Sequence, residues 1–136
     1  MTRRAAPPTG WPPPDLALLD GVEVALGPLC EEIAARYFDR FPEDLRRYGE
    51  DAARAWEIHD TRYVLSWAIG AVEGRADLDR QVTWLAGVLE SRGFPLEHLA
   101  TNLDLAADVA AERLHGGDRV AEPLRAAATL VRSSFR

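Results

Sequence analysis

The residue with the widest range of chemistry in this sequence is a histidine inside a long aromatic stretch. His59 follows Trp56 by three positions and precedes Tyr63 and Trp67 by four and eight, so on a helix these side chains share one face. An imidazole there can bond to a carboxylate such as Asp60, point into a ligand pocket, or bind iron. We expect the first role, that of a core or rim histidine, and keep the other two open.

Other reactive side chains are few and isolated. The single cysteine, Cys30, lies among apolar residues, so we expect a small buried side chain rather than a reactive thiol. His98 and His115, at the two ends of a predicted helix, are expected to be structural, His98 through packing or a contact with Glu97. The three histidines lack the spacing of a metal site, and no nucleophile motif is present. These features predict neither an enzyme nor a bound metal or cofactor.

The composition limits the class of protein. The 136 residues fit one domain, and 47% hydrophobic residues are enough for a core without disulfides. A net charge of -6 argues against nucleic-acid binding, because phosphate backbones repel an acidic chain. No apolar run reaches the roughly 20 residues of a membrane span, and no targeting segment is visible. We therefore expect a cytoplasmic protein.

Periodic apolar residues predict an all-α chain whose helices must position these side chains. Residues 1–14 are rich in proline and are expected to form a flexible arm, with docking through Trp11 as the alternative. Asp15 is a candidate N-cap, a Gly-Pro pair at 27–28 predicts a break, and Pro123 fits only in a first helical turn. No segment alternates with a two-residue period over a useful length. The predicted domain, 15–136, is a bundle of six main helices and one short helix, over 15–26, 28–41, 42–48, 50–73, 77–91, 95–115 and 118–135.

Two segments carry a resemblance to bacterial globins. Residues 37–48, with the sequence YFDRFPEDLRRY, are similar to the globin pattern of an aromatic-rich helix, a Pro-Glu turn and an aromatic residue that packs on haem, here Tyr48. Residues 91–99, with the sequence SRGFPLEHL, resemble the globin stretch that follows the haem-binding histidine and opens the penultimate helix. The order and lengths of the predicted helices also resemble a globin over nearly all of 15–136.

The resemblance fails at the haem-binding histidine. Four residues before Gly93, where a globin carries this ligand, the chain has Leu89, which also fits the apolar stripe of its helix. The chain therefore resembles the non-haem, globin-like sensor domains of bacterial stress and sporulation signalling, some of which bind an apolar molecule in place of haem. The resemblance implies a pocket, and the residues expected to line it are Tyr37, Phe41, Tyr48, Trp56, His59, Tyr63, Val88 and Leu89.

Three functions follow, in order of preference. The first is a non-enzymatic sensor domain that binds an apolar small molecule, such as a fatty acid, and signals through a partner protein. The second is a haem protein that uses His59 as the iron ligand for gas or redox sensing. The third is a protein-interaction module with a filled core and no ligand. A homodimer is compatible with each, although arginines interrupt any apolar seam on the last two helices, at Arg113, Arg119, Arg125 and Arg132.

Overall fold

The fold is described by a computed structural model that covers residues 12–134. The docking arm predicted around Trp11 lies outside these residues. From residue 42 onward the helix bounds agree with the predicted ones within two residues, and the predominantly helical character of the fold is confirmed. No helix in this part of the chain is long and apolar enough to cross a membrane. The elements, in order, are β1 (Leu16–Leu19), β2 (Val22–Ala25), α1 (Leu26–Arg40), α2 (Pro42–Tyr48), α3 (Glu50–Val72), α4 (Leu78–Ser91), α5 (Leu96–Arg113) and α6 (Asp118–Ser134).

The predicted first helix, over 15–26, is wrong, because this segment forms a β-hairpin. β1 and β2 pair antiparallel, with Leu16 opposite Ala25. Both turn residues have a positive φ, 54° at Asp20 and 78° at Gly21. A two-residue hairpin turn requires this conformation, and an Asp-Gly pair adopts it at low steric cost. The turn sequence therefore outweighs the helical propensity of the leucines before it.

Asp15, which we expected to cap a helix, instead fixes the open end of the hairpin. Its carbonyl oxygen accepts a hydrogen bond from the N–H of Leu26 at 2.9 Å, and its carboxylate pairs with Arg62 of α3. Arg62 also donates to the carbonyl oxygens of Pro13 at 2.9 Å and Pro14 at 3.3 Å. The end of the proline-rich arm is therefore bonded to α3.

Of the two prolines expected in first helical turns, one lies there and one does not. Pro28 lies in the first turn of α1, as expected, although α1 already begins at Leu26 and the predicted break between two helices at 27–28 does not occur. A proline in this turn sacrifices no helical hydrogen bond. Pro123 lies beyond the first turn of α6, inside the helix, although we expected it only in a first turn. The carbonyl of Arg119 consequently has no helical N–H donor at that position.

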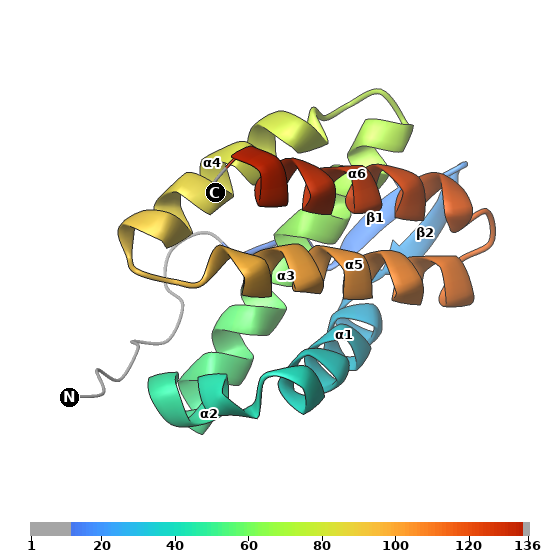
Figure 1. Cartoon of the computed structure of the whole chain (residues 1–136). Helices are drawn as coiled ribbons and strands as arrows, with labels where there is room; N and C mark the ends of the chain where they lie inside the picture. The colour runs from blue at the N-terminus through green and yellow to red at the C-terminus, as the bar shows by residue number, and fades with distance from the viewer. Residues whose placement is uncertain (1–11, 135–136) are drawn as a thin grey trace.

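The main hydrophobic core lies where α5 and α6 run side by side and α3 crosses them, as Figure 1 shows. The two helices approach closely at their connection, where a Cβ on Gly117 would lie 1.9 Å from the carbonyl oxygen of Ala110, so only glycine fits. Cys30 of α1 is fully buried in this core, as predicted. Burial raises the pKa of its thiol to about 12, which keeps the sulfur protonated and unreactive.

A second, smaller cluster of buried side chains forms where α1, α2 and the start of α3 meet. Its buried members include Tyr37, Phe38 and Ala53, with Phe41 and Tyr48 packed against them. The ring of Tyr37 lies 5.1 Å from those of both Phe38 and Phe41, between centroids. This aromatic cluster forms one boundary of the cavity described next.

Candidate functional site

A cavity of about 180 Å³ lies between the aromatic cluster, α3, α4 and the first turns of α5. α1 to α5 all contribute to its wall, together with the connection between α4 and α5. The wall mixes aromatic and aliphatic side chains with carboxyl, amide, imidazole and guanidinium groups. Its residues are Tyr37, Phe38, Asp44, Tyr48, Ala53, Trp56, Glu57, Asp60, Val64, Leu85, Leu89, Arg92, Phe94, His98, Leu99 and Asn102.

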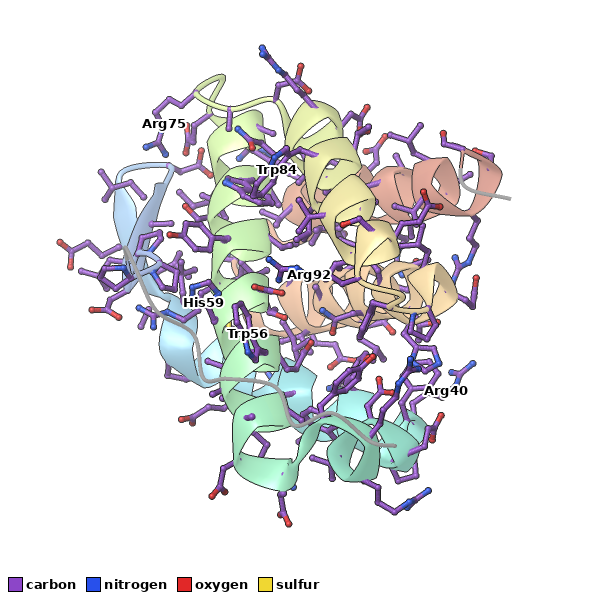
Figure 2. The ribbon with its side chains drawn as sticks, turned by 90° about the vertical axis from the view of Figure 1, so that its left-hand side faces the viewer. Arg40, Trp56, His59, Arg75, Trp84 and Arg92 are labelled. Atoms are coloured by element: carbon purple, nitrogen blue, oxygen red, sulfur yellow. The ribbon has the colours of Figure 1, made fainter. Side chains whose placement is uncertain are left out.

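α3 supplies two of the carboxyl groups because of its helical periodicity. Ala53, Glu57, Asp60 and Val64 recur every three or four residues, so they share one face, and all of them line the cavity. The helix turns His59 about 100° away from its neighbour Asp60. Figure 2 shows the consequence, with Arg92 in the space between α3 and α4 and His59 on the opposite side of α3.

The cavity wall brings together half of the residues that the sequence analysis selected. Those in the wall are Tyr37, Tyr48, Trp56 and Leu89. Those outside it are Phe41, His59, Tyr63 and Val88. Phe41 lies directly behind the wall, since its ring stacks on that of His98 with 3.8 Å between the ring centroids.

His59 and Tyr63 belong to an aromatic row on another face of α3. The ring centroid of His59 lies 5.3 Å from those of Trp56 and Tyr63, and Tyr63 continues the row to Trp67 at 5.8 Å. Nδ1 of His59 lies 2.9 Å from Oδ1 of Asp60. This is the carboxylate contact expected of a core or rim histidine, and His59 reaches the cavity only through its neighbours.

A buried carboxylate joins α1, α2 and α5 beside the cavity. Asp44 is 2% exposed, and its Oδ2 accepts a hydrogen bond from the Tyr37 hydroxyl at 2.5 Å and lies 2.9 Å from Nδ1 of His98. Burial, and then this hydrogen bond, raise the pKa of Tyr37 far above its usual range. Of the two roles expected of His98, packing is confirmed, since its ring stacks on that of Phe41, whereas Glu97 pairs with Arg132 at 3.1 Å.

A chain of hydrogen bonds links α3 to α5 across the cavity wall. The side-chain N–H of Asn102 donates to the hydroxyl of Thr61 at 3.1 Å, and that hydroxyl donates to the Glu57 carboxylate, also at 3.1 Å. Asn102 is 5% exposed, and its Oδ1 has no hydrogen-bond partner among the residues that the structure describes. A buried polar atom without a partner is rare and destabilising, so it marks a place where a bound molecule or water completes the structure.

The two α3 carboxyls are partly open to the cavity and otherwise enclosed by protein. Burial raises the pKa of Glu57 well above its usual value, and the hydrogen bond from Thr61 only partly opposes this. Burial likewise raises the pKa of Asp60, against the opposing effects of His59 and of the Arg92 charge. A positive charge placed between these two carboxyls would lower both pKa values.

Sequence reasoning missed most of the polar wall. Asp44 of α2 meets His98 of α5, and Asn102 of α5 bonds to Thr61 of α3. Sequence spacing carries no information on such long-range contacts. Glu57 and Asp60 had a visible signal, since two carboxyls share a face with Ala53 and Val64 on a helix that was expected to be largely buried. A carboxyl on the buried face of a helix indicates a polar cavity or a paired charge.

The residues present do not fit a haem group. Leu89 lines the cavity with an apolar side chain that cannot bind iron, and His59 lies outside the wall. His98 is in the wall, but its Nδ1 contacts Asp44 and its ring faces are packed by Phe41 and other aromatic residues. Across residues 12–134, no three side chains that could hold a metal ion gather in one place.

Comparisons with protein-family models, with curated proteins and with solved structures gave no match to this chain. The candidate site therefore has to be interpreted from its own geometry. That geometry offers a largely apolar, partly open cavity with carboxyl and amide groups in its wall.

Proposed function

We propose that this chain is a globin-like sensor domain, which binds a small and largely apolar molecule in the cavity and signals through a partner protein without catalysing a reaction. The observation that carries the proposal is the cavity of about 180 Å³ with Trp56, Leu89 and two tyrosines in its wall. An apolar cavity of about 150 Å³ engineered into another protein binds benzene, so this volume has room for a molecule with one ring. The aromatic walls supply dispersion and orientation.

The globin-like part of the proposal is supported by where the two resembling segments meet. Residues 37–48 contribute Tyr37, Asp44 and Tyr48 to the cavity wall, and residues 91–99 contribute Arg92 and three others. The two segments are far apart in the sequence and converge on one cavity. In a globin the corresponding segments enclose the haem. In this chain the proposed ligand is smaller and occupies the cavity between the same two segments.

The sensing part of the proposal rests on how many helices share the cavity. Because α1 to α5 all contribute to its wall, a ligand in the cavity would contact several helices whose packing against one another can change. A ligand shifts the population of two packings only if it prefers one of them, and this arrangement provides the contacts for such a preference. The unpaired Cys30 fits a reducing compartment, so we place the function in the cytoplasm.

The proposal is tested with ethylbenzene as a neutral one-ring probe, followed in the ¹H–¹⁵N spectrum of the full chain. Backbone signals of the cavity residues are expected to shift in a saturable way. Ala53→Leu places a larger side chain at a buried wall position and is expected to abolish these shifts. Ala126→Leu, on the exposed side of α6, is the matched control. If no probe of this size binds, the ligand-free interaction module becomes the better explanation.

Haem binding through His59 is the competing function, and an absorption spectrum tests it. Protein produced with ample haem is expected to show no Soret band. A Soret band that disappears in His59→Ala would overturn the non-haem proposal and identify His59 as the iron ligand. A band that persists in this variant would indicate another ligand, with His98 as the imidazole in the cavity wall.

A further inference from the structure

One side of the cavity wall contains a buried hydrogen-bond acceptor without a partner among the described residues. The amide of Asn102 uses its nitrogen to bond Thr61, and its buried Oδ1 has no partner in the part of the chain that the structure describes. The Thr61 hydroxyl in turn donates a hydrogen bond to the Glu57 carboxylate. In this chain of hydrogen bonds the amide oxygen of Asn102, and not its N–H group, is therefore left without a partner at a residue of the cavity wall. An oxygen acceptor calls for a ligand with a hydrogen-bond donor.

Two carboxyl groups stand beside this acceptor. Glu57 and Asp60 lie three residues apart on α3, and both line the cavity. Asp60 contacts His59 through its Oδ1. On the opposite wall the Tyr37 hydroxyl donates to Asp44 and is not available to a ligand. Arg92 is the cation in the wall, but it is an exposed residue.

The remaining walls suit a cation with an apolar body. Tyr48 and Phe94 stack with 6.1 Å between their ring centroids, and Trp56 adds a third aromatic ring. The faces of aromatic rings attract positive charge, and their area buries an apolar group. A carboxylate in the same place would lie against two further carboxyl groups, whose ionisation it would oppose. A hydrocarbon would leave the Asn102 oxygen without a partner.

We propose that the cavity takes a small primary amine, bound as its ammonium ion, with an apolar body of about one ring. The inference rests on the proposed function, because it names the ligand class of the same cavity. The ammonium group donates three hydrogen bonds, toward Asn102 Oδ1 and the carboxyls of Glu57 and Asp60. The ring occupies the space between the aromatic residues and Leu89.

The experiment compares three probes of similar size on the full chain at pH 7, namely benzylamine, ethylbenzene and benzoate. Ethylbenzene replaces the ammonium group of benzylamine by a methyl group, and benzoate inverts the charge. Hydrogen bonds to charged groups imply an affinity about tenfold to a hundredfold higher for benzylamine than for ethylbenzene. Benzoate is expected not to bind. Dissociation constants come from titrations followed by the ¹H–¹⁵N spectrum.

Two isosteric variants test which groups recognise the amine. Glu57→Gln and Asp60→Asn are each expected to weaken benzylamine binding about tenfold and to leave ethylbenzene binding unchanged. Glu90→Gln on the exposed face of α4 is the matched control and changes neither affinity. The dispersion of the spectrum reports whether each variant is folded, and either variant alone suffices for the test.

The possible outcomes separate the two proposals. If ethylbenzene binds as tightly as benzylamine, the amine inference is overturned while the proposed function stands. The inference also fails if the preference for benzylamine survives in both folded variants. If none of the three probes binds, the proposed function fails together with the inference. Preferential benzylamine binding that both variants reduce supports both.

Discussion

The single helix α5 contributes to two regions of opposite character. In the main core it presents Leu103, Ala106 and Ala110, which are buried with the apolar residues of α6. In the cavity wall it presents His98 and Asn102, whose neighbours are carboxyl and hydroxyl groups. In the main core, the α5 side chains are apolar and pack against other apolar side chains. The cavity wall buries an amide oxygen without a partner and raises the pKa of nearby carboxyls.

The difference indicates that the main core stabilises the fold and that the cavity wall has another role. Gly117 permits close packing of α5 against α6, and this packing stabilises the fold. The buried polar groups of the cavity wall lower the stability of the fold. Groups that destabilise a fold persist where they have another role, and they cluster at binding sites. Substitutions in the core and in the cavity wall should therefore differ in their effects on stability.

The largest contrast is expected between two leucine truncations. Leu103→Ala, in the fully buried core, removes packed methyl groups and should lower the free energy of unfolding by about 3–5 kcal/mol. Leu89→Ala, at a half-buried position in the cavity wall, only enlarges an existing space and should lower it by about 1 kcal/mol. Urea unfolding measures both values. Equal losses would contradict the distinction between a packed core and a cavity wall.

An intermediate effect is expected for the carboxylate that joins the aromatic cluster to α5. Asp44→Ala leaves the Tyr37 hydroxyl and His98 without their buried partner and should cost about 2–3 kcal/mol of stability. Tyr37→Phe removes one of these bonds and should cost about 1 kcal/mol. Asp39→Ala, exposed on α1, serves as the control in the same denaturation experiment. A loss in Asp44→Ala no larger than in the control would mean that this network does not stabilise the fold.

The smallest effect concerns Glu57 and depends on pH. Because the folded protein holds the Glu57 proton more tightly than the unfolded chain, its stability is full below the ordinary pKa of 4.5 and falls as the pH rises toward the raised value. Glu57→Gln carries no such charge, so it should equal the wild type near pH 4 and exceed it at pH 7, by more than the ~0.5 kcal/mol typical of surface substitutions. Urea unfolding at both pH values checks this, with Glu90→Gln as control. A variant that is less stable than the wild type at pH 7 would show that the ionised carboxylate stabilises the fold.

The sequence was sufficient to predict the helical part of the fold. Wide apolar stripes and the punctuating glycines and prolines located α2 to α6, because these signals are local and agree with one another. The hairpin was missed although it carried a local signal, the Asp-Gly pair at 20–21. The leucines before that pair favour a helix in isolation, and strand pairing together with the bonds of Asp15 decided the outcome.

The candidate site was predictable only in part. Tyr37, Tyr48, Trp56 and Leu89 were found because helical spacing and the globin resemblance both point to them. The polar wall depends on contacts such as that of His98 with Asp44, which are 54 residues apart. No periodicity connects two such residues. His59 was singled out by its chemistry, yet the rotation of the helix per residue places Glu57, two positions before it, and Asp60, one position after it, in the cavity wall instead.

The buried thiol of α1 makes the rate at which the core opens directly measurable. Cys30 is the single cysteine of the sequence, its side chain is fully buried, and its pKa of about 12 keeps it protonated in the closed state. A thiol reagent can attack only when α1 separates from the core and the sulfur ionises. At a high concentration of reagent the labelling rate becomes the opening rate, and at a low concentration it reports the opening equilibrium. The labelling rate of Cys30 in the unmodified chain therefore reports how often α1 separates from the core. A ligand that stabilises the closed fold is expected to lower this rate.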